Sequence, residues 1–115
     1  MIATGITFIA TAVLLAVVAR LTATGRIKRN AYGGIRTKAS MADDESWLIV
    51  HKAAQPWMFA SAAALLAAGV GAFIAGSNDA AIGIVSLVGA LFCAVFAFAG
   101  TAAGRRAVAR RDLPK

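Results

Sequence analysis

The chain has 115 residues, of which 60% are hydrophobic and only 15% are charged. Soluble domains are about 45–50% apolar and about 25% charged. A chain this short leaves too large a share of its surface in water to hide so much apolar side chain. The composition therefore argues against a soluble enzyme, and the formal charge of +7 must be concentrated outside the apolar stretches.

Residues 1–19 form the first of these stretches and carry no charge. A helix needs about 20 apolar residues to cross the hydrocarbon core of a membrane, so we expect a spanning helix over about residues 2–20. A cleaved signal peptide is the alternative, and it would carry basic residues ahead of its apolar run. Here the basic residues Arg20, Arg26 and Lys28 follow the run, which favours an uncleaved segment whose N-terminus lies outside.

Residues 21–55 form a basic loop with signs of structure. Gly25 is placed to stop the first helix, and Gly33 with Gly34 permits a tight turn. Ser40 can cap a short helix over about residues 41–54, whose acidic residues fall in its first turn. We expect this helix to lie along the cytoplasmic membrane surface, and Pro56 to begin the next span at a bend. Its apolar face combines Trp47, Val50, His51 and Ala54.

Two further uncharged stretches follow, at residues 53–78 and 80–104. They predict spans over about residues 56–76 and 80–103, ahead of a basic tail at residues 105–115. In lipid, a spanning segment satisfies its backbone hydrogen bonds internally. The sequence therefore predicts an all-α membrane protein in a single domain, residues 1–115, with three transmembrane helices and a structured cytoplasmic loop containing a short interfacial helix.

The charge is divided between the loops. Residues 20–55 carry a net +4, the turn between the last two spans carries only Asp79, and the tail carries +4. Lys and Arg in short loops mark the cytoplasmic side, so we expect the N-terminus outside and the C-terminus inside the cell. The basic residues lie close to the span ends, where anionic lipid headgroups are nearer partners than nucleic acid, and no nucleic acid is expected.

The spans contain no ionisable side chain, which disfavours a pump or an ion-coupled transporter. They are rich in small residues that let helices approach closely, either within the chain, in a homo-oligomer or against a membrane protein partner. These are Ala60, Ala64, Ala68, Ala72, Gly100 and Gly104. Cys93 is the only cysteine and His51 the only histidine, so neither a metal site nor a cofactor is expected.

The loop resembles the signature of the SdpI family of bacterial membrane proteins. The ordered residues that carry the resemblance are Asn30, Gly34, Ile35, Arg36, Thr37, Ser40, an acidic pair, Trp47 and His51. It covers about residues 26–76, while the third span agrees only in hydropathy. The resemblance implies a membrane protein that protects a producing cell from a secreted peptide toxin, in some members with signalling through a captured repressor.

Within this motif, Arg36 can bind a carboxylate or phosphate through its planar guanidinium; the alternatives are a lipid-phosphate anchor or an ion pair with a loop carboxylate. Trp47 is either a partner contact or an interfacial belt residue. His51 is either a pH-responsive group or a hydrogen-bonded one, and Asn30 and Thr37 are expected to hydrogen-bond the turn.

No nucleophile and base are paired, which argues against an enzyme. We predict a protein that binds a toxin or protein partner through this loop. The alternative is an accessory subunit of a larger membrane complex, for example a respiratory one.

Overall fold

A computed structural model describes residues 2–30 and 33–112, and in this part of the chain it contains three helices and no strand. They are α1 (Ile2–Ala23), α2 (Asp44–Ala75) and α3 (Asp79–Arg111). All three are long and apolar enough to cross a membrane. The prediction of an all-α protein with three spanning helices is confirmed, while residues 31–32 of the predicted loop and 113–115 of the predicted tail lie outside the described residues.

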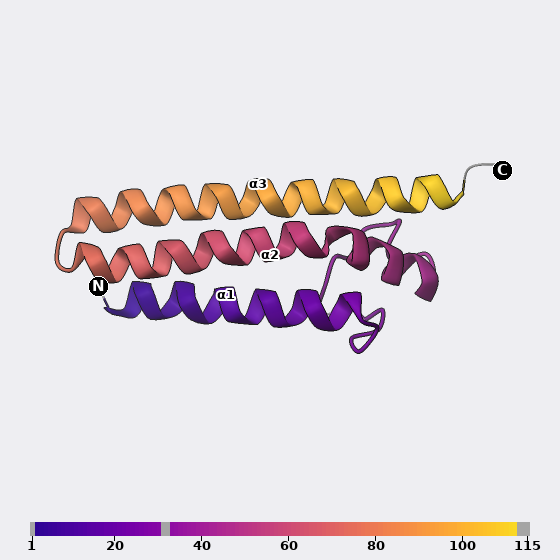
Figure 1. The fold of residues 1–115 in the computed structure, drawn as a ribbon, viewed down its shortest axis with the longest axis horizontal. Helices are drawn as coiled ribbons and strands as arrows, with labels where there is room; N and C mark the ends of the chain where they lie inside the picture. Colours follow the sequence, from indigo (N-terminus) through magenta and orange to yellow (C-terminus); the bar gives the residue numbers. More distant parts are fainter. Residues whose placement is uncertain (1, 31–32, 113–115) are drawn as a thin grey trace.

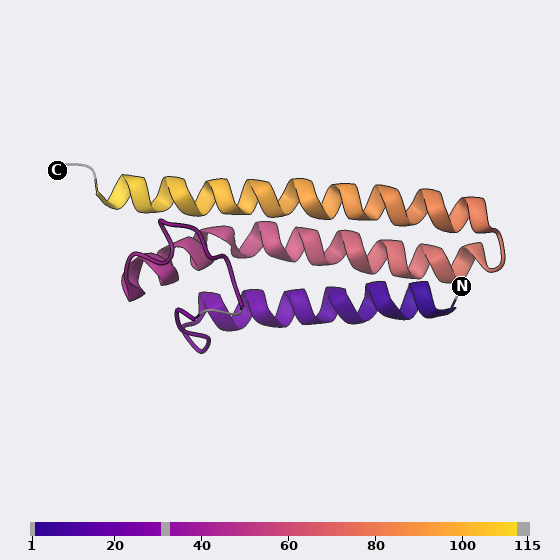
Figure 2. The ribbon, with the colours of Figure 1, turned by 180° about the vertical axis from the view of Figure 1, so that it is seen from behind.

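The helices lie side by side in a narrow layer that measures 57 × 23 × 18 Å (Figure 1). α2 is in the middle, and α1 and α3 each pack on it, whereas between the described residues of α1 and α3 there is no packing. Figure 2 shows the same order from behind. The N-terminus and the α2–α3 turn lie at one end, and the long loop and the end of α3 lie at the other. We call this second end the loop end.

Short polar residues set the helix boundaries. The Asp43 carboxylate accepts a hydrogen bond from the Ser46 N–H at 2.7 Å and so caps α2, and Asn78 caps α3 in the same way. The prediction that Ser40 caps this helix is therefore wrong. Gly25 follows α1 with φ +80°, and Gly76 ends α2 with φ +62°, a backbone region that glycine enters without a steric cost.

The segment predicted as a separate short helix, residues 41–54, instead forms the first part of α2 from Asp44 onward. Pro56 lies inside α2, where its ring and missing N–H disturb the hydrogen-bond ladder. Figure 1 shows the first part of α2 leaning away from the line of the rest. At the other terminus, α3 runs on to Arg111 and so takes in most of the segment predicted as a basic tail.

Small residues bring the helices into close contact. A Cβ added at Gly104 would lie 2.6 Å from Val50 Cγ1, and one added at Gly100 would lie 2.8 Å from Met58 Cε. This Gly-x-x-x-Gly pair therefore packs α3 on α2 within the chain. Ser61 Oγ adds a hydrogen bond across the same pair of helices, to a main-chain carbonyl of α3 at 2.8 Å.

Candidate functional site

Trp47 anchors the loop from inside the molecule. Its side chain is only 2% exposed, and its indole N–H donates to the Ile27 carbonyl at 3.0 Å, which ties the segment after α1 to the start of α2. Its ring lies against that of His51, with 4.2 Å between the ring centroids. A buried indole with a satisfied N–H positions other groups, so Trp47 holds the loop together from within rather than standing out on its surface.

His51 holds the motif backbone through both ring nitrogens. Nε2 lies 2.8 Å from the Ile35 nitrogen and accepts its N–H, and Nδ1 lies 2.7 Å from the Trp47 carbonyl. These partners assign the proton to Nδ1 and require a neutral ring. His51 precedes the uncharged part of α2, and burial lowers its pKa below the usual 6.5, while the bond to the Trp47 carbonyl opposes that shift.

Position 34 requires glycine for two reasons: its backbone has a positive φ, and there is no room for a Cβ. Its φ is +93°, and an added Cβ would come within 2.8 Å of Trp47 Cη2 and 2.9 Å of His51 Nε2. A side chain at this position would therefore be strained and would also press on the two rings. The Gly-Ile-Arg-Thr segment can lie on Trp47 and His51 only because its first residue is glycine.

Short hydrogen bonds fix the two ends of this segment. The Asn30 side chain donates to the Lys28 carbonyl at 2.7 Å and accepts the Gly33 N–H at 2.8 Å. At the other end, Ser40 is fully buried; its hydroxyl accepts the Thr37 N–H at 2.9 Å and lies 2.7 Å from the Ile35 carbonyl, to which it donates. Asn30, Thr37 and Ser40 thus shape the loop.

The three carboxylates at the start of α2 form ion pairs with Arg29 and Arg111. Arg29 Nε lies 3.5 Å from the Asp44 carboxylate, and the Arg111 guanidinium lies 3.9 Å from Asp43 and 3.8 Å from Glu45. The Arg111 guanidinium also donates to Ser46 Oγ at 2.9 Å. The end of α3 is thereby fastened to the first turn of α2.

Arg36 has no such partner among residues 2–30 and 33–112: the structure contains no ion pair between its exposed side chain and a described carboxylate. The alternative that it pairs with Asp43, Asp44 or Glu45 is therefore wrong. The loop presents Arg36 as an unpaired guanidinium, which can bind a carboxylate or phosphate through two parallel hydrogen bonds.

A cavity of about 400 Å³ lies beside Arg36. Its loop end is formed by Gly34, Ile35, Arg36, Thr37 and His51, and its remainder is lined by side chains from all three helices. The structure thus brings together five of the seven candidate residues, while Asn30 and Trp47 support them from outside the cavity. The helix residues of the lining are not apparent in the sequence, because nothing distinguishes Leu15 or Ala97 from other apolar residues of the spans.

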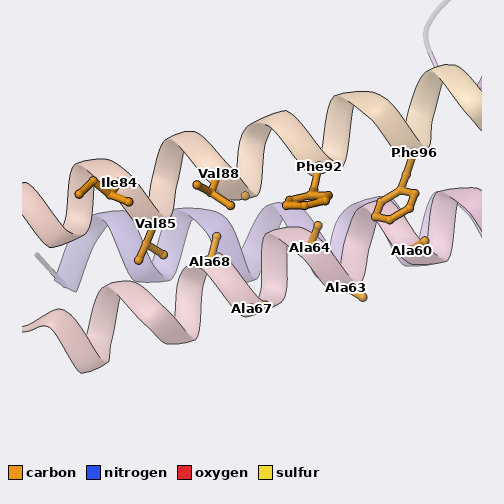
Figure 3. Close-up of a pocket in the computed structure, with 11 residues that line it drawn as sticks. Ala60, Ala63, Ala64, Ala67, Ala68, Ile84, Val85, Val88, Phe92 and Phe96 are labelled. Atoms are coloured by element: carbon orange, nitrogen blue, oxygen red, sulfur yellow. The ribbon is translucent and has the colours of Figure 1, made fainter.

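A second hollow lies between α2 and α3 (Figure 3), with a volume of about 690 Å³. Phe92 and Phe96 of α3 stand over the small side chains of Ala60 and Ala64 on α2. All eleven residues that line it are apolar. The surface offers packing to lipid or to another helix, but it has no polar group that would orient a ligand.

One family model matches the part of the chain that contains the loop motif. The family model described as the SdpI/YfhL protein family matches residues 26–102, which include the whole motif, all of α2 and most of α3. The chain belongs to the SdpI/YfhL family. No curated protein and no solved structure matches the chain.

In this SdpI/YfhL-family chain, the cavity is built from two sources. Its loop residues and its lining from α2 and α3 fall inside the matched range, whereas its lining from α1, including Leu15 and Val18, precedes that range. Within the described residues no group of three or more His, Cys, Asp or Glu side chains could hold a metal ion. The exposed guanidinium of Arg36 is the group in this candidate site that can bind an anion.

Proposed function

We propose that this chain is a non-enzymatic protein of the bacterial inner membrane, with its N-terminus outside and its loop end in the cytoplasm, that binds a toxin or protein partner in the manner of SdpI-type immunity and signalling proteins. Family membership and three spanning helices support the general role. The observation that carries the specific one is Arg36, whose exposed guanidinium pairs with no carboxylate of the described residues and lies on a loop whose backbone is held by His51.

The motif residues have two different roles, partner contact and positioning of the loop. Arg36 contacts the partner, because its planar guanidinium can bind a carboxylate through two parallel hydrogen bonds and the backbone N–H of the residue before it is held by His51. Gly34, Trp47 and His51 are positioning residues, since they are engaged with each other inside the chain. Removal of Arg36 should therefore abolish binding without unfolding the loop, whereas removal of Trp47 should disturb the loop itself.

The test compares Arg36→Gln with Lys38→Gln, which removes an equally charged and exposed side chain two residues later. Both variants are expressed at the same membrane level in cells challenged with the peptide toxin of a producing strain, and the proteins that co-purify are identified by mass spectrometry. We expect protection, or the co-purifying partner, to be lost only with Arg36→Gln. If this variant still protects and keeps every partner, the proposed role of the loop is wrong.

The second candidate is an accessory subunit of a larger membrane complex. It is favoured by the outer face of α3, which packs on one neighbour only and leaves large apolar side chains exposed, such as Leu87 at 72% and Phe98 at 77%. Lipid or a partner helix can cover such a face. Purification in a gentle detergent separates the two: stoichiometric recovery with large partners supports a subunit, and a chain that migrates alone or as a homo-oligomer rules it out.

A further inference from the structure

The cavity beside Arg36 changes from apolar to charged along its length. Its apolar part is lined by Leu15 and Val18 of α1, Met58 of α2 and Ala97 of α3, all of which belong to the uncharged stretches. Its other end is formed by the loop, and Arg36 is one of the loop residues that line it. A ligand that fits this order has an apolar chain at membrane depth and a polar group at the loop.

The charges around the cavity define that polar group. Of the residues that line it, all within the described chain, Arg36 alone carries a formal charge. The hydroxyls of Thr22 and Thr101 already donate to carbonyls of their own helices at 2.8 and 3.0 Å, and both His51 nitrogens are engaged. What remains to be satisfied is one cation, so the complementary ligand has one anionic group.

We propose that this cavity binds one acidic phospholipid, with an acyl chain lying between α1 and α3 and its phosphate on Arg36. A volume of about 400 Å³ is in the usual range of about 300–1,000 Å³ for sites of small ligands. α1 and α3 line the cavity without packing on each other, so a lipid chain can enter between them from the bilayer. The proposal goes beyond the partner binding above, since it concerns the chain without any toxin or partner.

A lipid is favoured over an anionic peptide because the apolar part of the cavity lies among the spanning helices and the charged residue lies at the loop. A phospholipid already holds its chain in the hydrocarbon core and its phosphate at the surface, which is the order of polarity that the cavity offers. An extended peptide would bring backbone N–H and carbonyl groups into an apolar space where few free hydrogen-bond partners remain, at a cost of about 1–3 kcal/mol for each unsatisfied group.

The purified full-length chain in detergent is titrated with phosphatidylglycerol or with diacylglycerol of the same acyl chains, which lacks the phosphate, and bound lipid is counted by native mass spectrometry. We expect one phosphatidylglycerol per chain, retained about tenfold or more over diacylglycerol, as for a charge-assisted hydrogen bond to the phosphate. Arg36→Gln should remove this preference, and Lys38→Gln, whose side chain does not line the cavity, should keep it. Equal retention of the two lipids, or an unchanged preference in Arg36→Gln, would overturn the proposal.

A second pair of variants tests the chain-binding part without touching Arg36. Ala97→Leu fills the cavity and should weaken phosphatidylglycerol binding, whereas Ala94→Leu, on the exposed side of α3, should not. Glycerol phosphate has the anion but no chain; if it displaces the lipid at equal concentration, the site binds only the headgroup and the acyl-chain assignment is wrong. Since no partner is present in this assay, its failure leaves the protection experiment unaffected, and the reverse also holds.

Discussion

Gly34→Ala is the sharpest test of how the loop is held. In a positive-φ position a residue with a Cβ costs about 1–2 kcal/mol relative to glycine. The new Cβ would also come within 2.8 Å of the Trp47 ring and 2.9 Å of His51 Nε2, and overpacking of this kind costs about 1–3 kcal/mol. We therefore expect the loop to open about 2–5 kcal/mol more easily in the variant.

Substitutions at two other glycines separate the cost of the positive φ from the cost of overpacking. Gly33→Ala meets no atom within 4 Å and has no positive φ, so we expect a change within about 0.5 kcal/mol. Gly76→Ala has φ +62° but open space around its Cβ, so it should show the backbone cost alone, about 1–2 kcal/mol, at the α2–α3 turn.

Hydrogen exchange of the Ile35 amide reports this opening directly, because its N–H is donated to His51 Nε2. A cost of 2–5 kcal/mol should lower its protection by at least about thirtyfold in Gly34→Ala. Protection equal to that of Gly33→Ala would refute the packing of the Gly-Ile-Arg-Thr segment on Trp47 and His51.

Further outcomes follow from single contacts. Trp47→Phe removes the donor to the Ile27 carbonyl and should cost about 1–2 kcal/mol of loop stability, measured by the same exchange; an unchanged rate contradicts it. Because burial lowers the pKa of His51, its stabilisation is complete above its usual pKa of 6.5 and is lost as the pH falls toward the lower native pKa. The Ile35 amide should lose protection as the pH falls below 6.5, after correction for intrinsic exchange, and a flat profile refutes this. Ser61→Ala should cost about 0.6 kcal/mol in detergent unfolding, and an effect above about 2 kcal/mol would show that more than this bond is lost.

The spans could be predicted from the sequence because an uncharged stretch long enough to cross a membrane is a local property. The course of the chain around Pro56 could not be predicted, because proline is equally typical of the first turn of a new helix. In the structure the helix continues through Pro56, and the residues on either side of it, Ala54 and Trp57, lie close to Gly100 of α3. The capping residue was missed for a related reason: Ser40, Asp43 and Ser46 are all acceptable caps, and only the loop geometry selects Asp43.

The site was predictable as a set of residues but not as a geometry. The motif order identifies Gly34, Arg36, Trp47 and His51, yet the burial of Trp47 depends on a contact with Ile27, twenty residues earlier. Two of the carboxylates at the start of α2 pair with Arg111, which lies near the far end of the chain. Such pairings are long-range, and periodicity and composition carry no information about them.

The central place of α2 also sets an order in which the chain can assemble. The loop after α1 is held by Trp47 and His51, which are synthesised later, so it cannot take its shape until the first turns of α2 exist. The hydrogen bond from the Arg111 guanidinium to Ser46 Oγ can form only after α3 has been inserted. A chain whose loop is ordered, and which therefore presents Arg36, has already brought the segment after α1 against the first turns of α2.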